Sequence, residues 1–203
     1  RLAEAQVMID PESAPREEGE PAPIPDGTPQ DAIALLLKLK DRRGLNSYEL
    51  AQVWNTLAFA YYTVEDVPNT VKAYENVLLQ GTITEALEQS VVRALFQLYY
   101  SQENYKRSIE YIERWEGLRE EPDAGVTFIK ATAYYQLEDF NSSLKFALRC
   151  EEIAIQQQKT VKENWWYLQV VLYNELKEID KTILVLEKLI TTYPKKQYWM
   201  HLA

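Results

Sequence analysis

The sequence predicts an all-α fold built from repeated pairs of antiparallel helices. From Asp31 onward, apolar residues recur every three or four positions in blocks of about 12–15 residues, which is the period of an amphipathic helix. No stretch alternates with period two for long enough to indicate a sheet. Glycine is scarce, at 6 residues, whereas tyrosine reaches 14 and tryptophan 5. This composition suits helices that pack through aromatic rings and need few glycine turns.

The chain also repeats itself. Four segments each contain a tyrosine near the end of a first helix and then a short polar turn. An apolar or aromatic residue follows six positions after the tyrosine, and a small residue comes three positions later. Successive tyrosines are 38, 35 and 39 residues apart. The repeat tyrosines are Tyr61, Tyr99, Tyr134 and Tyr173. The apolar or aromatic residues that follow them are Val67, Tyr105, Phe140 and Ile179. The small residues are Thr70, Ser108, Ser143 and Thr182.

These repeats predict the organisation of the chain. Residues 1–30 form a proline- and glutamate-rich leader or linker without periodicity, which we expect to be largely disordered. Residues 31–203 form the repeat array, and the repeats favour one elongated domain. The expected parts are a lone second helix at 31–43, repeats at 47–80, 86–120, 124–158 and 163–194, and a truncated fifth repeat at 196–203.

The array resembles the tetratricopeptide repeat (TPR) family, whose period is about 34 residues. The resemblance implies a right-handed superhelical solenoid of antiparallel helix pairs. Trp54, Trp166 and Trp199 fall at the large residue that opens a first helix. The repeats depart from the family where threonine or serine replaces its usual small alanine, and where Ala58, Phe96, Ala131 and Val170 replace its usual glycine. An ordinary helical bundle is the alternative.

A narrower resemblance concerns the second half of the chain. The segments KENWWYLQVVLYNELK, VLEKLITTYPKKQYWMHLA and YYSQENYKRSIEYIERW are similar to bacterial TPR proteins encoded beside TonB-type energy-transduction systems. That resemblance implies a periplasmic protein that works with TonB, with ExbB and ExbD, or with an outer-membrane receptor. The chain opens with Arg1, so we expect a missing N-terminal piece such as an export signal or a lipoprotein anchor. A cytoplasmic location is the alternative.

Charge and hydropathy exclude two classes of partner. The net charge is −9, so the phosphates of nucleic acids and of anionic lipids would repel the chain. No apolar run approaches the roughly 20 residues of a transmembrane helix.

Catalytic and metal-binding patterns are absent from the sequence. The one histidine, His201, and the one cysteine, Cys150, lie far apart in sequence and cannot supply the ligands of a zinc site. There is no nucleotide-binding glycine loop and no EF-hand pattern, and the paired glutamates read as solvated surface. We therefore predict a protein that is not an enzyme and has no cofactor or metal, with Cys150 as a small buried apolar residue.

The candidate binding surface follows from the TPR resemblance, which implies that the first helices line a concave groove. The groove positions lie one, five and eight residues after the large first-helix residue, along one helical stripe. Tyrosine offers apolar area with a hydroxyl, Asn and Gln can hold a peptide main chain, and arginine can pair with a carboxylate. The candidate residues, called the first-helix face below, are Asn55, Phe59, Tyr62, Arg93, Gln97, Tyr100, Phe128, Tyr135, Tyr167 and Asn174, with Thr132 and Val171 at the two remaining positions.

The sequence thus predicts a non-catalytic scaffold that binds a peptide or protein partner. The alternatives are a cytoplasmic adaptor or regulator, and a structural module that self-associates. For the last, the chain stops at Ala203 inside a repeat, and we expect its final apolar face to be covered by further residues or by a second copy.

Overall fold

The computed structural model describes residues 1–14, 16 and 20–202, and these residues form helices and connecting segments without any strand. The chain divides into two compact units, Arg1–Leu98 and Tyr99–Ala203. The sequence favours one elongated domain, whereas the division falls inside a helix, α5 (Glu85–Ser101). Each unit is described by itself.

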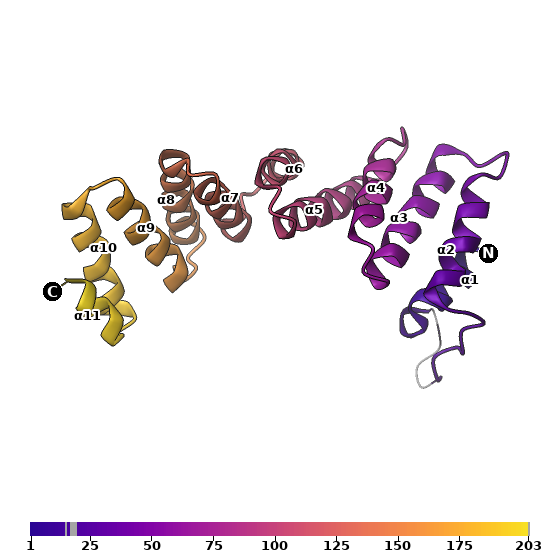
Figure 1. Ribbon diagram of the computed structural model, residues 1–203, viewed down its shortest axis with the longest axis horizontal. Coiled ribbons are helices and arrows are strands. Elements are labelled where there is room, and N and C mark those ends of the chain that lie inside the picture. The colour runs from indigo at the N-terminus through magenta and orange to yellow at the C-terminus, as the bar shows by residue number, and fades with distance from the viewer. Residues whose placement is uncertain (15, 17–19, 203) are drawn as a thin grey trace. The chain divides into compact units, whose positions relative to one another are not determined.

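The first unit is a stack of helices whose first four share a buried cluster. Helices α3 and α4 pack as an antiparallel pair, α2 packs against α3, and the short α1 contacts both α2 and α3 (Figure 1). Their cores meet in a cluster that includes Ala5, Leu36, Val53, Leu57 and Ala73. The elements are α1 (Leu2–Ile9), the 3-10 helix η1 (Pro11–Ser13), α2 (Pro29–Lys40), α3 (Ser47–Thr63) and α4 (Val67–Leu78).

Helix α1 corrects the prediction of a largely disordered leader over residues 1–30. Ala5, Met8 and Ile9 are all buried, and they join the core of the first unit. The composition that predicts disorder belongs to the proline-rich residues 11–29, whereas the first nine residues carry an apolar stripe at helical spacing. Tertiary burial stabilises this stripe as a helix.

Helix α2 begins at Pro29 rather than at the expected Asp31. Thr28 and Asp31 form a capping box: the Asp31 amide donates to Thr28 Oγ1 at 3.3 Å, and the Thr28 amide donates to Asp31 Oδ2 at 2.9 Å. Proline is favoured in the first turn because its missing N–H would have no helical partner there. The helix ends at Lys40, short of the expected residue 43.

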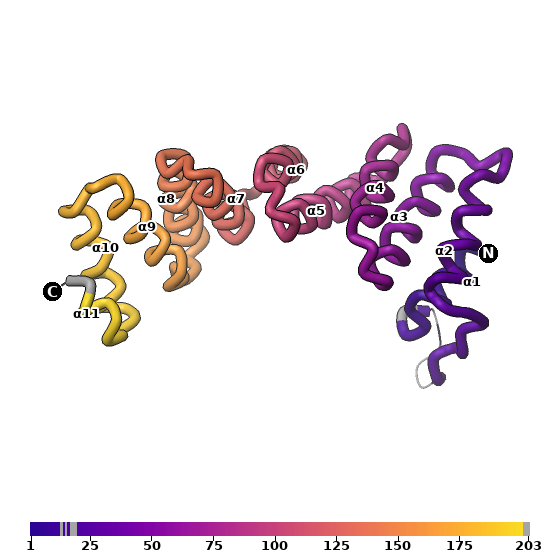
Figure 2. Tube along the Cα trace, in the orientation of Figure 1, coloured from indigo at the N-terminus to yellow at the C-terminus, as the bar shows by residue number. Residues whose placement is uncertain are grey.

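The second unit is a series of packed helix pairs. Helices α7 and α8 form one pair and α9 and α10 another, while α6 packs against α7, α8 against α9, and α10 against α11 (Figure 1). Two buried clusters join α7, α8 and α9, and a third joins α9 to α10 and α11, helices that follow one another along the tube of Figure 2. The helices are α6 (Tyr105–Gly117), α7 (Ala124–Gln136), α8 (Phe140–Gln156), α9 (Glu163–Glu175), α10 (Ile179–Thr192) and α11 (Lys196–Leu202).

One turn geometry recurs between the two helices of each repeat. The fourth residue after the repeat tyrosine has a positive φ, and the amide of the next residue donates to the tyrosine carbonyl. This is the Schellman arrangement, which ends the first helix and starts the second after three residues. It explains why the first residue of each second helix follows the repeat tyrosine by six positions. The positive-φ residues are Glu65, Glu103, Glu138 and Lys177, with φ of 59°, 59°, 59° and 60°.

The small residue of the second helix is buried against the first helix in three of the four repeats, whereas Thr182 in the fourth is half-buried. Ser143 is fully buried, and its hydroxyl donates to the Ala131 carbonyl of the paired helix at 2.8 Å. Thr70 and Ser108 are fully buried at the matching positions. The hydroxyl replaces the methyl group of alanine here because a backbone carbonyl can accept its hydrogen bond.

Helix α10 lacks a cap that the other second helices possess. Asp66, Asn104 and Asp139 each cap a second helix through a side-chain oxygen, whereas Glu178 makes no such bond. We expect Glu178→Asp to raise the free energy of unfolding by about 0.5–1 kcal/mol. The shorter carboxylate can accept a hydrogen bond from the backbone amides of the first turn of α10, which have no partner within the helix. Urea unfolding followed by circular dichroism measures the change. A destabilised variant would show that the ion pair of Glu178 with Lys181 outweighs the cap.

Candidate functional site

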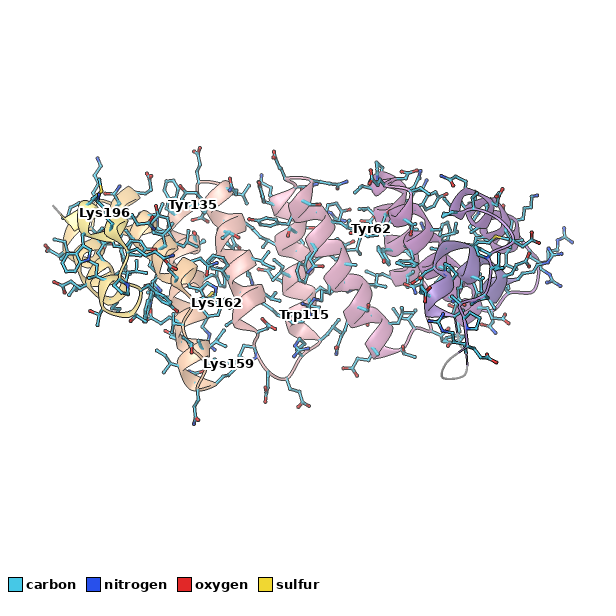
Figure 3. All side chains as sticks on the ribbon, turned by 90° about the horizontal axis from the view of Figure 1, so that it is seen from below. Tyr62, Trp115, Tyr135, Lys159, Lys162 and Lys196 are labelled. Atoms are coloured by element: carbon cyan, nitrogen blue, oxygen red, sulfur yellow. The ribbon has the colours of Figure 1, made fainter. Side chains whose placement is uncertain are left out.

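In the first unit, α3 presents its three candidate residues toward the outside. Phe59 is 43% exposed and Tyr62 is 58% exposed (Figure 3), while Asn55 is half-buried. Asn55 and Phe59 line a hollow of about 380 Å³ whose opposite wall comes from α1, through Ala3, Gln6 and Val7. Sequence reasoning missed this wall because the leader was expected to be disordered.

Helix α5 contributes three further candidate residues. Arg93 and Gln97 are exposed in the first unit. Tyr100, which belongs to the second unit, is half-buried, and its hydroxyl donates to Thr132 Oγ1 on α7 at 3.1 Å. Thr132 in turn donates to the Ile129 carbonyl, so its oxygen is free to accept from the tyrosine. This bond joins the candidate positions of two consecutive repeats.

Two candidate tyrosines are held in the same way. The Tyr100 ring packs edge-on against Tyr105 with centroids 5.3 Å apart, and the Tyr135 ring packs against Phe140 at 5.7 Å. In both repeats the partner is the first residue of the second helix. Tyr135 lies at the C-terminal end of α7 (Figure 3). The ring contacts fix the side chains and so reduce the entropy that binding would cost.

The Tyr105 hydroxyl stays protonated at neutral pH. Burial, the Glu103 carboxylate and Tyr100 raise its pKa above the ordinary value for tyrosine. The candidate face therefore offers neutral phenol groups here, which can both donate and accept hydrogen bonds.

Phe128 has a different environment from the tyrosines. Its ring lies 6.2 Å from that of Trp165, centroid to centroid, and it packs against two buried clusters between α7, α8 and α9. The side chain is half-buried. Phe128 therefore contributes to packing between repeats.

Helix α9 exposes its candidate residues at both ends. Tyr167 is 39% exposed, Asn174 is exposed, and Val171 between them is half-buried. Tyr167 lines a hollow of about 370 Å³ together with Lys195 and Tyr198, which follow in the next repeat.

A hydrogen-bonded carboxylate organises this hollow. Glu163 accepts from Lys195 Nζ at 2.7 Å and from the Tyr198 hydroxyl, and these bonds lower its pKa. The Tyr198 ring packs against Tyr167 with centroids 6.2 Å apart. The arrangement places an ionised carboxylate and an ammonium beside an exposed aromatic ring.

A second surface, not predicted from the sequence, lies between α8, α9 and α10. It is a cleft of about 640 Å³ with Leu148, Tyr173 and Val185 among its apolar lining residues. The run of four apolar residues Ile183–Leu186 in α10 is the sequence signal, because one helix face cannot bury all of them. Leu184 is accordingly 59% exposed.

Glu151 forms the polar wall of that cleft. It accepts from Gln169 Nε2 at 3.0 Å and from Lys188 Nζ at 2.9 Å. Burial acts to raise its pKa, but the hydrogen bonds outweigh burial and hold the pKa below the ordinary value. The Glu151 carboxylate is therefore ionised at neutral pH and held by the Gln169 amide and the Lys188 ammonium.

Cys150 is a fully buried residue in the cluster that joins α8 to α9, and burial raises its pKa to about 12. At pH 8 about one thiol in ten thousand would then be ionised, and the thiolate is the reactive form. We expect no modification by a thiol reagent at pH 8 in the folded protein, and complete modification in denaturant. Absorbance of the released chromophore measures both. Rapid modification of the folded chain would contradict the buried assignment.

Within the part of the chain that the structure describes, no group of three or more His, Cys, Asp or Glu side chains could hold a metal ion. None of its helices is long and apolar enough to span a bilayer. The side chain of His201 lies outside the described residues, so its expected structural role stays a prediction.

Comparison with known proteins gives a likeness in structure alone. No model of a protein family matches the chain, and no curated protein matches it. YrrB, a TPR protein with an unusual peptide-binding site, is 18% identical over 86% of this chain and 82% of its own, with a TM-score of 0.61. MamA of strain AMB-1 is 14% identical over 79% of this chain and 80% of its own, with a TM-score of 0.60.

RapI in its apo form is 12% identical over 84% of this chain and 51% of its own, with a TM-score of 0.59. Identities this low carry information about the fold and not about the ligand. The helix pairs and the likeness to these structures together establish an all-α, TPR-like fold of consecutive helix pairs.

Proposed function

We propose that this protein is a non-catalytic scaffold that binds a peptide or protein partner on its first-helix face. The observation that carries the proposal is the hydrogen bond between Tyr100 and Thr132, which connects the candidate positions of consecutive repeats in the second unit. A surface shared by neighbouring repeats suits a ligand that extends along the helices rather than a small molecule in a closed cavity.

The chemistry of the face suits a polypeptide. Exposed Tyr167 offers a broad apolar ring with a hydroxyl, and exposed Asn174 on the same helix offers an amide that can both donate and accept. Side chains of this kind bind with a small loss of conformational entropy. The peptide-binding site of YrrB, a protein of like fold, is a precedent for this use.

Two variants test whether the partner binds on the first-helix face. Replacing Tyr100 and Tyr167 together by alanine should weaken partner binding at least tenfold, because tyrosines in the middle of an interface commonly contribute 1–2 kcal/mol each. The partner is first captured by the immobilised wild-type chain and identified by mass spectrometry, and its affinity is then measured for each variant. Leu184→Ala, in the cleft on α10, is the control and should bind normally. Loss of binding in the control alone would place the partner in the cleft and overturn the proposal.

A finer proposal rests on the sequence resemblance to TPR proteins encoded beside TonB-type systems. On that basis the chain acts in the periplasm as an accessory of TonB, ExbB and ExbD or of an outer-membrane receptor. Purified periplasmic segments of TonB and ExbD can be titrated against the chain by biolayer interferometry. Saturable binding that the Tyr100 and Tyr167 replacements abolish would support the finer proposal, and absence of binding to every component would remove it.

A further inference from the structure

A tyrosine of the first-helix face lies beside a glutamate in each of two consecutive repeats of the second unit. The amide of Glu103 donates to the Tyr100 carbonyl at 3.0 Å, and the amide of Glu138 donates to the Tyr135 carbonyl at 2.9 Å. Both glutamates are the positive-φ residues of their turns, so the same backbone geometry fixes each of them next to its tyrosine. These are called the Tyr/Glu pairs below: Tyr100 with Glu103, and Tyr135 with Glu138.

The carboxylates of the Tyr/Glu pairs have no cation of their own. Glu103 and Glu138 are exposed, and neither forms an ion pair with a lysine or arginine among the described residues. Burial raises the pKa of Tyr105, and the Glu103 carboxylate raises it further, so this charge lies near the ring that packs against Tyr100. Each pair therefore offers a partly exposed aromatic ring together with an unpaired carboxylate.

Elsewhere in the chain, an aromatic ring with a carboxylate holds a lysine. In the fourth repeat, Lys181 Nζ lies 5.5 Å from the centroid of the Tyr173 ring and pairs with Glu178. Lys130 is held likewise, by the Phe146 ring and two carboxylates. The face of the ring attracts the cation, and the carboxylate adds a charge-assisted hydrogen bond. The Tyr/Glu pairs have the same two components and no lysine of the chain to fill them.

The two Tyr/Glu pairs are spaced for an extended peptide. The hydroxyl of Tyr100 bonds Thr132 on α7 at 3.1 Å, so the end of α5 that carries Tyr100 is a neighbour of α7, the helix of Tyr135 (Figure 3). Neighbouring helices pack with their axes about 8–10 Å apart. An extended chain advances about 3.3 Å per residue, so every third side chain meets the next repeat.

We propose that the segment bound on the first-helix face is an extended basic peptide with lysine or arginine side chains three residues apart. These cations lie on the rings of Tyr100 and Tyr135 and pair with Glu103 and Glu138. The inference rests on the proposed function, because it names the class of ligand for the same face. The net charge of −9 also favours a basic ligand, and the same carboxylates repel an acidic one.

The fourth repeat ends the basic stretch of the ligand. Asn174 and Lys177 occupy the positions of the Tyr/Glu pair there, and the Lys177 amide donates to the Asn174 carbonyl at 3.0 Å. Lys177 is exposed and repels a further cation of the ligand at this repeat. The ligand therefore carries two basic residues at the three-residue spacing, with a residue of no positive charge opposite α9.

Synthetic peptides test the class of ligand. The probe is a labelled peptide of alanine and serine that carries two lysines three residues apart, and fluorescence anisotropy measures its binding to the full chain. Saturable 1:1 binding is expected. A second peptide with both lysines acetylated keeps the length and loses the charges, and it should bind at least tenfold more weakly. Absence of binding by the lysine peptide, or equal binding by the two peptides, overturns the proposal.

Two double variants locate the binding. Glu103→Gln with Glu138→Gln removes both carboxylates, and the affinity for the lysine peptide should fall at least tenfold. Glu120→Gln with Glu121→Gln is the matched control, because it changes the net charge equally at exposed positions before the other end of α7. The control should bind within about twofold of the wild type, since salt screens distant charges. Equal losses in both variants, or no loss in the first, would contradict the proposal.

Reversing the charge of the fourth repeat tests the register. Lys177→Glu extends the row of carboxylates to a third repeat, at a φ of 60° that glutamate adopts in the other turns. A peptide with a third lysine, three residues beyond the second, should bind at least threefold more tightly to this variant than to the wild type. Unchanged or weaker binding would overturn the assigned spacing.

The captured partner separates failure of this inference from failure of the proposed function. Its binding should weaken both in the Tyr100 and Tyr167 double variant and in the Glu103 and Glu138 double variant. Loss in the tyrosine variant alone would remove the basic ligand and leave the binding face in place. Loss in neither would remove both proposals. Circular dichroism of each variant establishes that its helices are folded.

Discussion

Replacing Trp165 by alanine is expected to lower the free energy of unfolding of the second unit by about 4 kcal/mol. The indole is only 4% exposed and packs with Ala124, Cys150 and Ile153, which come from α7 and α8. Its removal leaves a cavity where three helices meet, and the rigid helix pairs cannot collapse fully to fill it. Urea unfolding followed by circular dichroism at 222 nm measures the loss.

Trp199→Ala provides the matched control in the same unit. Trp199 is 58% exposed, so the same substitution should change stability by less than about 1 kcal/mol. Similar losses for the two variants would contradict the packing described for α7, α8 and α9.

Lys130→Ala is expected to cost about 2–3 kcal/mol, which is large for a lysine. The residue is 4% exposed, its ammonium pairs with Glu116 at 2.9 Å and with Glu113 at 3.3 Å, and it lies 4.5 Å from the centroid of the Phe146 ring. The variant loses these charge interactions and the packing of the aliphatic stem. Thermal or urea unfolding measures the change.

Lys130→Met separates the two contributions. Methionine keeps most of the volume and loses the charge, and the side chains of Glu113 and Glu116, which are 55% and 35% exposed, can return to water. We expect a cost of about 1 kcal/mol, well below that of the alanine variant. A methionine variant as unstable as the alanine variant would show that the ion pairs and not the stem dominate.

The pattern of the sequence predicts the helix pairs because local chemistry specifies them. The tyrosine, the three-residue turn and the small residue correspond to one backbone motif, and Ser143 shows why the small position matters, since it bonds the Ala131 carbonyl. Helix bounds within the repeats are likewise set by local caps such as Asp66 and Asp139. Such signals lie within a few residues and need no knowledge of tertiary structure.

The sequence could not supply what depends on contacts between distant segments. Helix α1 is stabilised by burial against α2 and α3, because its eight residues are too few to form a stable helix in isolation. The helical stripe predicts Phe128 on the candidate face, yet its half-buried ring packs beside that of Trp165, a contact between repeats that the stripe does not reveal. The cleft between α8, α9 and α10 likewise depends on how three helices pack. The sequence shows only the run of apolar residues in α10, which one helix face cannot bury.

Site-specific photo-crosslinking tests the proposed binding face most directly. A photoreactive phenylalanine analogue is placed at Tyr167 on the first-helix face and, separately, at Leu184 in the cleft, and the chains are irradiated with the captured partner. The account predicts a crosslink from position 167, mapped by mass spectrometry to a segment of the partner, and little from position 184. Crosslinks from position 184 alone would contradict the account and move the binding surface to α8, α9 and α10.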